Sequence, residues 1–181
     1  EEGISELFVP QENAAEAALI PELRVFPVST LAQLITHLEG VEAIPPPPLT
    51  PFSPSLPFSP HSLSHVRGLQ SAKRALLVTA AGGHHLFLSG PPGTGKTMLA
   101  QILPSLLPPP DLEEGIEITR IYSSVGLLGK EPILTRRPFR APHHSASYAA
   151  LIGGGTDPRP GEISLAHRGV LFLDEFPEFS R

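Results

Sequence analysis

Gly90-Pro91-Pro92-Gly93-Thr94-Gly95-Lys96-Thr97 is the stretch that decides the fold of this 181-residue chain. It satisfies the pattern G-x-x-x-x-G-K-[S/T] in full, between an apolar strand predicted at residues 86–88 and a helix predicted at residues 96–107. Glycines in such a loop let successive backbone N–H groups turn inward and form a concavity that binds anions, and the positive end of the following helix adds to it. We therefore predict a phosphate-binding loop from Gly90 to Met98, with ATP as its ligand.

Two side chains of the loop and two acids further on carry the predicted chemistry. Lys96 supplies a mobile cation for the β- and γ-phosphates, and the hydroxyl of Thr97 is placed to ligate Mg²⁺. An apolar strand predicted at residues 170–173 runs straight into Asp174 and Glu175. Because ligands bind at the carboxyl ends of the strands in open α/β folds, we expect Asp174 to hold Mg²⁺, directly or through water. Glu175 is then expected to polarise the water that attacks the γ-phosphate.

An acid pair after a strand is, in isolation, more often a helix cap or a solvated turn. It is the presence of the phosphate-binding loop in the same chain that favours the catalytic interpretation of Asp174 and Glu175.

Strands and helices alternate along the chain, which favours an α/β fold with a parallel sheet flanked by helices on both faces. The predicted strands are residues 6–9, 24–28, 86–88, 116–122 and 170–173, and the predicted helices are residues 14–19, 31–39, 71–81 and 96–107. Asn13 and Thr30 are expected to cap the first two of these helices.

A proline-rich stretch separates two parts of opposite charge. Prolines 45–48, 51, 54, 57 and 60 exclude a helix or a central strand, so this stretch predicts a semi-rigid linker, with a proline-rich recognition site as the alternative. Residues 1–48 carry a net charge of −7 and residues 49–181 a net charge of +2, as two units with different roles would. We predict a first segment at 1–44, the linker at 45–62 and a second domain at 63–181.

The composition excludes several classes of protein. Cysteine is absent, so this stretch holds neither disulfides nor thiolate metal sites. No run approaches the roughly 20 apolar residues of a membrane span, and the acidic opening is unlike a signal peptide. These features favour a cytoplasmic protein with no membrane partner. Because the chain begins with Glu1 and stops soon after an apolar strand, we expect it to be a piece of a longer polypeptide.

Several motifs together resemble those of the ComM/YifB family, AAA+ ATPases related to the motor subunit of magnesium chelatase. The matching runs are Ala72-Lys73-Arg74-Ala75-Leu76, Ala80-Ala81-Gly82-Gly83-His84-His85, Arg137-Pro138-Phe139-Arg140-Ala141-Pro142-His143-His144, Ile152-Gly153-Gly154-Gly155 and the segment 160–175. Val9-Pro10, Asn13-Ala14 and Glu16-Ala17 in the acidic opening are similar to the end of the Lon-protease-like domain that precedes the motor in that family.

The resemblance implies an AAA+ P-loop sheet, preceded by the C-terminal part of a Lon-like α+β domain. It further implies a homo-hexameric ring ATPase that acts on single-stranded or branched DNA, in branch migration during natural transformation and recombination. The AAA+ strand order 5-1-4-3-2 implies that a strand following Arg181 lies between residues 86–89 and 170–173, and that the γ-phosphate sensor, arginine finger and lid also follow. We therefore expect residues 1–181 alone to hydrolyse ATP poorly or not at all.

Two other functions stay open. One is the ATPase subunit of a chelatase that inserts a metal into a porphyrin held by a partner protein; the Lon-like opening favours the DNA motor over it. The other is a regulatory module that uses ATP only to change shape. Glu175 argues against that module, because a switch needs no residue to activate water.

The resemblance also implies, within residues 136–168, an insertion that forms a hairpin facing the pore of the ring. Their turn-forming runs are Gly153-Gly154-Gly155 and Pro158-Arg159-Pro160-Gly161. The arginines of this region would contact either DNA phosphates or acids of a neighbouring subunit; they are Arg136, Arg137, Arg140 and Arg159. The histidines at 143, 144 and 167 lack the spacing of a metal site, so a structural role is expected for them.

Overall fold

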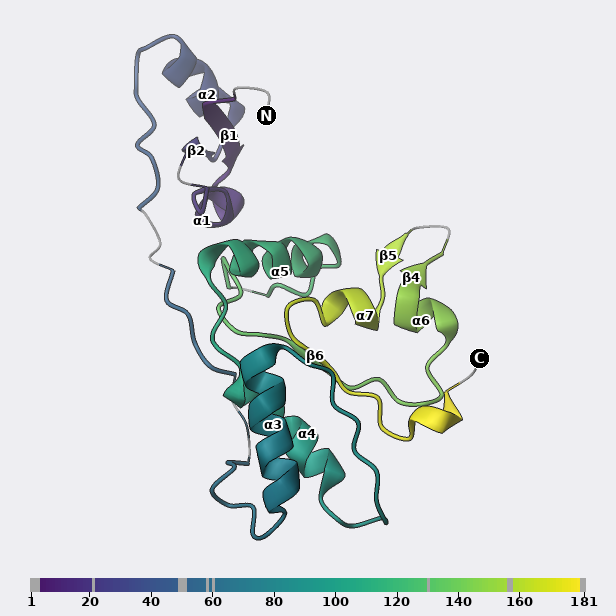
Figure 1. The fold of residues 1–181 in the computed structure, drawn as a ribbon. Helices are drawn as coiled ribbons and strands as arrows, with labels where there is room; N and C mark the ends of the chain where they lie inside the picture. The colour runs from purple at the N-terminus through teal and green to yellow at the C-terminus, as the bar shows by residue number, and fades with distance from the viewer. Residues whose placement is uncertain are drawn as a thin grey trace. The chain divides into compact units, whose positions relative to one another are not determined.

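The computed structural model describes residues 4–20, 22–48, 52–57, 59, 61–129, 131–155 and 158–179. The chain forms two compact units, the first comprising residues 1–52 and 130–133 and the second residues 53–129 and 134–181 (Figure 1). The described part of the proline-rich stretch 45–62 contains neither helix nor strand, as its prolines predict. None of the helices in the described residues is long and apolar enough to cross a membrane.

The first unit is built on two parallel strands. Strand β1 (Glu6–Pro10) pairs along its whole length with β2 (Arg24–Val28), as predicted for residues 6–9 and 24–28. Helix α2 (Leu31–Leu38) follows β2, and the hydroxyl of Thr30 accepts a hydrogen bond from the amide of Gln33, which confirms the predicted cap.

The predicted helix at 14–19 is only partly correct. The strands are joined by the 3-10 turn η1 (Gln11–Asn13) and the short helix α1 (Ala14–Ala17). Asn13 already has helical backbone angles, and its side chain makes no capping hydrogen bond. A cap residue needs an extended backbone to bring its side chain over the first amides, and Asn13 lacks that conformation.

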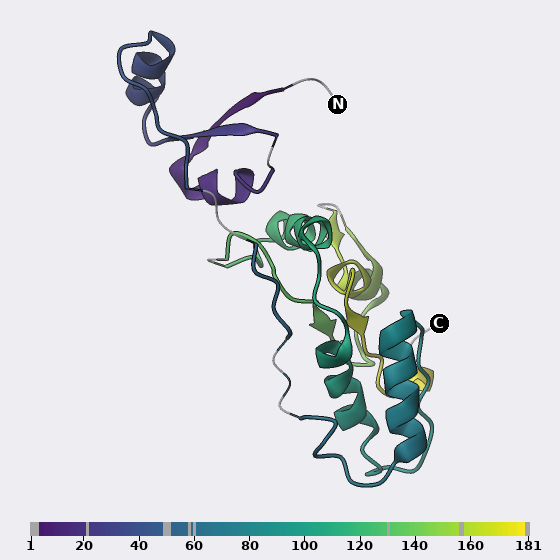
Figure 2. The ribbon, with the colours of Figure 1, turned by 60° about the vertical axis from the view of Figure 1, so that its left-hand side comes forward.

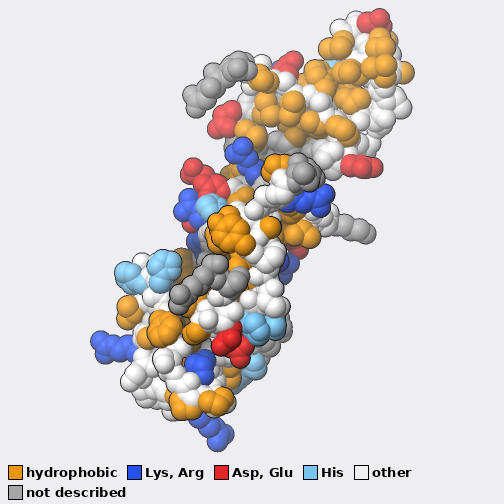
Figure 3. Space-filling model, turned by 90° about the vertical axis from the view of Figure 1, so that its right-hand side faces the viewer, with side chains coloured by type: hydrophobic (Ala, Val, Ile, Leu, Met, Phe, Trp, Pro, Cys, Tyr) orange, Lys and Arg blue, Asp and Glu red, His pale blue; other side chains and the backbone are white. Residues whose placement is uncertain are grey.

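Aromatic rings pack together at the centre of the first unit. The ring of Phe8 stacks on that of Phe26 with centroids 5.1 Å apart, and His37 from α2 packs against both rings. The Nδ1 atom of His37 also accepts a hydrogen bond of 2.9 Å from the amide of Ile44. Much of this unit's apolar surface stays exposed in Figure 3, and its exposed apolar residues include Ile4, Ile20, Leu31, Ile35, Leu38 and Val41.

In the second unit two long helices pack side by side (Figures 1 and 2). They are α3 (Gln70–Gly82) and α4 (Lys96–Leu106), which agree within a residue with the helices predicted at 71–81 and 96–107. Helix α3 ends at Gly83, whose φ of +62° is the left-handed conformation that glycine adopts at a helix end. The buried core between the helices consists of Val66, Leu76, Leu99 and Ile102.

The strand predicted at residues 116–122 is wrong, because these residues belong to helix α5 (Leu112–Ser124). Asp111 accepts from the amide of Glu114, and the side chain of Glu114 accepts from the amide of Asp111, so the helix begins with a complete capping box. Gly115, Ile118 and Thr119 are the buried residues, at the i, i+3, i+4 spacing of one helical face. The β-branched residues suggested a strand, whereas the cap and the helical spacing determine the structure.

The strand predicted at residues 86–88 is wrong: these residues form neither helix nor strand, and no partner strand lies beside them within the described residues. Leu86 and Leu88 pack against the core between α3 and α4, while the Phe87 side chain between them is 80% exposed. Packed and exposed side chains therefore alternate as they do in a strand, but within the described residues no second strand forms a hydrogen-bonded ladder with this segment. A ladder requires a neighbouring chain segment to supply the hydrogen bonds, and local sequence does not supply one.

The predicted strand at 170–173 is shorter than expected and has an unexpected partner. Strand β6 (Val170–Leu171) pairs in parallel with β3 (Phe139–Arg140), and the rings of Phe139 and Phe172 stack 6.2 Å apart. Gly169 precedes β6, and a Cβ atom there would overlap the carbonyl oxygen of Pro138. The backbones come this close only because residue 169 has no side chain.

The remaining elements form a hairpin between short helices. Helix α6 (Tyr148–Ile152) leads into β4 (Gly153–Gly154), which is antiparallel to β5 (Arg159–Pro160), as the glycine and proline runs predicted. Helix α7 (Glu162–Leu165) packs against α5, and the 3-10 turn η2 (Phe176–Glu178) follows β6.

The fold is mixed α/β, as expected, but the strands of the described residues are distributed over three two-stranded sheets. The single parallel sheet with helices on both faces is not found in this part of the chain. The two segments predicted to form its centre, 86–88 and 170–173, are not paired with each other.

Charged side chains hold α5 to the loops around it. Arg137 and Glu114 form a salt bridge of 2.7 Å, and Arg168 forms another of 2.7 Å with Glu117. His167 also contacts Glu117 at 2.9 Å. The hydrogen bonds from Arg168 and then from His167 lower the pKa of Glu117 to about 2.

We expect Asp111→Ala to lower the free energy of unfolding of the second unit by about 1 kcal/mol, because the amide of Glu114 loses its acceptor. Asp111→Ser keeps an acceptor and is expected to cost much less. Urea titration followed by far-ultraviolet circular dichroism measures both variants. Equal losses in the two would contradict the capping role.

Stability is expected to depend on pH through Glu117. Its pKa of about 2 in the folded chain lies below the ordinary value of 4.5. The ionised carboxylate of Glu117 therefore contributes to the free energy of unfolding above pH 4.5, and this contribution is lost as the pH falls toward 2.

Glu117→Gln should lower the melting temperature at pH 7, and the difference from wild type should shrink as the pH falls through that window. Glu113→Gln on the same helix is the control, and thermal scans at several pH values make the comparison. A constant difference at every pH would contradict this assignment.

Candidate nucleotide-binding site

The loop at residues 90–95 connects the extended segment 86–89 to the first turn of α4. Gly93 and Gly95 have φ values of +76° and +88°, which other residues adopt only with strain. The hydroxyl of Thr94 closes the turn by donating a 2.9 Å hydrogen bond to the carbonyl of Pro91. The backbone thus requires glycine at Gly95, which the motif fixes, and also at Gly93, which the motif leaves variable.

Lys96 folds back over this loop. Its Nζ atom donates to the carbonyl oxygen of Gly90 at 2.9 Å and to that of Pro91 at 2.8 Å. A lysine ammonium has three donors, so one remains for another acceptor at the same place. The loop therefore holds a positive charge at its mouth, next to the N-terminus of α4.

Thr97 and Asp174 are 77 residues apart in sequence and meet in the structure. The Thr97 hydroxyl donates a hydrogen bond of 3.0 Å to Oδ2 of Asp174. These are the two residues predicted to hold Mg²⁺, and both offer the oxygen ligands that this ion prefers. No group of three or more His, Asp or Glu residues that could hold a metal occurs among the described residues. Two protein ligands suit Mg²⁺, which commonly completes its shell with water and phosphate oxygens.

Glu175 lies beside this pair in a left-handed conformation, with φ of +53°. Its side chain is 63% exposed, and its Oε2 atom lies 2.9 Å from Nδ1 of His144. The rings of His143 and His144 pack together at a tilt of 37°, with centroids 4.0 Å apart. The sequence assigned these histidines a structural role, and the contact with Glu175 was not predicted, because it depends on the pairing of β3 with β6. His167 contacts Glu117 instead.

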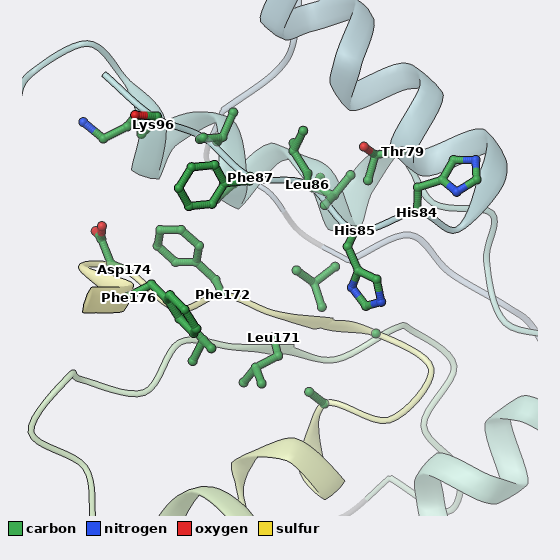
Figure 4. A pocket seen from close by; sticks show the side chains of 18 of the residues that line it. Thr79, His84, His85, Leu86, Phe87, Lys96, Leu171, Phe172, Asp174 and Phe176 are labelled. Carbon is green, nitrogen blue, oxygen red and sulfur yellow. The ribbon is translucent and has the colours of Figure 1, made fainter. Parts of the chain in front are cut away.

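A cavity of about 770 Å³ runs between the segment 86–89 and the chain at 169–174 (Figure 4). Lys96 and Asp174 lie at one end of it, and His84 and His85 at the other. Apolar side chains line the stretch between the two ends, among them Leu86, Phe87, Leu171 and Phe172. The charged end of the cavity is the place where the loop and Asp174 face each other.

The residues present fit a nucleotide with Mg²⁺. The loop supplies glycines in left-handed conformations, Lys96 supplies a cation, and Thr97 with Asp174 supplies oxygen ligands. Methyl Cε of Met98 would lie 3.3 Å from a Cβ placed on Gly95, so the start of α4 packs tightly against the loop.

Two of the four arginines predicted to meet DNA or a neighbouring subunit are engaged inside the second unit. Arg137 pairs with Glu114 and also donates to the carbonyls of Pro108 and Arg168. Arg140 forms two hydrogen bonds of 2.6 Å with Glu162, which raise its pKa above the ordinary value. For Arg137 and Arg140 the prediction is therefore corrected: their partners are acids of their own chain. The other two, Arg136 and Arg159, are not free of contacts either.

Comparison with known proteins identifies relatives of the chain. The family described as magnesium chelatase, subunit ChlI, matches residues 62–181. The chain is 48% identical to YifB of Escherichia coli over 176 residues, which is 97% of this chain and 34% of that protein. It is 47% identical to the competence protein ComM of Haemophilus influenzae over 179 residues, 97% of this chain and 35% of that protein.

The chain thus spans about a third of the length of these curated relatives. The similarity to YifB and ComM extends over nearly the whole of it, as the sequence motifs predicted, and the family match includes the loop, Asp174 and Glu175. The chain belongs to the magnesium chelatase subunit ChlI family, and within that family it is a member of the ComM/YifB group.

Proposed function

We propose that this chain carries the nucleotide site of an ATP-hydrolysing motor of the P-loop, AAA+ type that acts on DNA. The observation that carries the proposal is the hydrogen bond between Thr97 and Asp174. It joins the end of the glycine loop to the acid that follows β6, and it places two Mg²⁺-type ligands beside a lysine held in the loop. Membership of the magnesium chelatase subunit ChlI family supports the same kind of site.

Each residue of the site has a separate part in the proposed mechanism. Lys96 exchanges its bonds to the carbonyls of Gly90 and Pro91 for bonds to phosphate oxygens, and so neutralises charge there. Thr97 and Asp174 would hold Mg²⁺, and the ion would supply positive charge for the phosphate oxygens. Glu175 accepts a proton from the attacking water. Because Glu175 follows Asp174 directly, the metal ligand and the base share one short segment.

The wider function is proposed from the family and from the residues. We propose that the first unit is the C-terminal part of a Lon-like domain, and that the full-length protein assembles into a homo-hexamer. DNA as the partner is supported by the similarity to a competence protein and by the resemblance described above. Since Arg137 and Arg140 are paired within the chain, the proposal does not use them as DNA contacts. The cytoplasmic location stays a prediction.

A chelatase ATPase subunit is the second candidate, because the matching family takes its description from magnesium chelatase. Such a protein would respond to a porphyrin-carrying partner and not to DNA. A module that only switches shape is less well supported, since it would have no use for Glu175.

The decisive comparison is the ATPase rate of the full-length protein with and without single-stranded or branched DNA, in wild type and in Glu175→Gln. We expect DNA to stimulate wild type, and Glu175→Gln to lower the rate by about 100-fold or more, as removal of a general base does. Glu178→Gln, an exposed acid three residues further on, is the matched control and should keep the wild-type rate.

Nucleotide binding separates the roles of the site residues in the same experiment. A fluorescent ATP analogue should bind Glu175→Gln as tightly as wild type and Lys96→Ala much more weakly. ATP hydrolysis without any response to DNA would reject the DNA motor and leave the ATPase. Equal rates for wild type and Glu175→Gln would reject the assignment of the base.

A further inference from the structure

We propose that His144 is a positioning residue for Glu175: its ring nitrogen fixes one carboxylate oxygen so that the other is directed to the attacking water. The inference rests on the proposed function, because it concerns the residue assigned there as the base. Nothing in the sequence motifs pointed to it. It depends on the contact of 2.9 Å between Nδ1 of His144 and Oε2 of Glu175.

The backbone brings these two residues together through the parallel pairing of β3 with β6. Phe139 is opposite Val170 and Arg140 is opposite Leu171, so the chain leaves both strands at the same edge of the sheet. Both residues lie four positions beyond the end of their strand: His144 follows Arg140, and Glu175 follows Leu171. Equal distances from a common register place the two side chains within reach of each other. The ladder thus sets the two loop segments off from one edge, and the 2.9 Å contact is made where those segments turn.

The imidazole of His144 is itself held in place. The ring of His143 packs against it at a tilt of 37°, with 4.0 Å between centroids. His143 is in turn fixed by Ser145, whose hydroxyl lies 2.8 Å from Nδ1 of His143 and whose amide donates to the same nitrogen at 3.3 Å. The side chain of His144 is 35% exposed, compared with 63% for Glu175. The histidine is thus the more buried partner and has contacts of its own, which suits it to orient the carboxylate.

Glu175 needs such a partner because little else restrains its carboxylate. The amide of Glu175 donates to Oδ1 of Asp174, which fixes the backbone but not the side chain. Within the described residues, Oε1 of Glu175 has no hydrogen-bond partner. One oxygen is therefore engaged and the other is available to accept a proton. A general base works only when its oxygen is held within hydrogen-bonding reach of the water, and misplacement by about 1 Å costs on the order of 100-fold in rate.

The test is steady-state ATPase kinetics of the full-length protein. We expect His144→Ala to lower kcat by about 10- to 100-fold and to leave KM for ATP and the affinity for a fluorescent ATP analogue within about twofold. His144→Asn should recover most of the rate, because the Asn amide nitrogen occupies the position of the ring Nδ1 relative to Cβ. His167→Ala is the matched control: it removes another His–Glu contact of 2.9 Å, with Glu117, away from the site.

A double variant distinguishes positioning from a general structural effect. If His144 acts through Glu175, then His144→Ala adds nothing to the loss already caused by Glu175→Gln. The inference is overturned if His144→Ala keeps the wild-type kcat, if its loss multiplies with that of Glu175→Gln, or if His167→Ala causes the same loss. In each of these cases an active wild type that loses its rate in Glu175→Gln leaves the proposed function intact. An inactive wild type would instead reject the proposed function, and this inference with it.

Discussion

The two-residue parallel ladder between β3 and β6 is the interaction on which the site depends. The amide of Val170 donates to the carbonyl of Pro138 at 2.9 Å, and the amide of Phe172 donates to that of Arg140 at 2.8 Å. Gly169 makes this approach possible, since any side chain there would overlap Pro138. The ladder fixes where the chain emerges at Asp174 and Glu175, and so determines which residues those acids meet.

The charged side chains on the two sides of this ladder have different kinds of partner. Toward α5, three arginines and their acid partners form short salt bridges that hold helices and loops together, and these arginines are Arg137, Arg140 and Arg168. Toward the loop, and within the described residues, Lys96 is bound by carbonyl oxygens alone, and Asp174 by the Thr97 hydroxyl and its neighbouring amide alone. Neutral partners leave the charges of Lys96 and Asp174 uncompensated, which is the condition for a site that binds an anion together with a cation.

The glycine loop at residues 90–95 could be predicted from the sequence because its requirements are local. A left-handed backbone needs glycine at 93 and 95, and the start of a helix needs the residues that follow. The caps of α2 and α5 are equally local, yet only the first was predicted. At α5 the isoleucines at 116, 118 and 121 suggested a strand, although Asp111 and Glu114 already marked the beginning of a helix.

The sequence alone therefore determined the glycine loop and the two long helices α3 and α4, since left-handed glycines, helix ends and apolar spacing are local features. It predicted Thr97 and Asp174 as separate Mg²⁺ ligands, and their hydrogen bond to each other is a finding of the tertiary structure. Only the tertiary structure decided that residues 86–88 have no partner strand among the residues it describes, that β6 pairs with β3, that Arg137 and Arg140 are bound by their own chain, and that His144 reaches Glu175. The physical reason is common to these four. Strand partners and ion pairs join residues distant in sequence, and no local pattern records which distant segment supplies the other half.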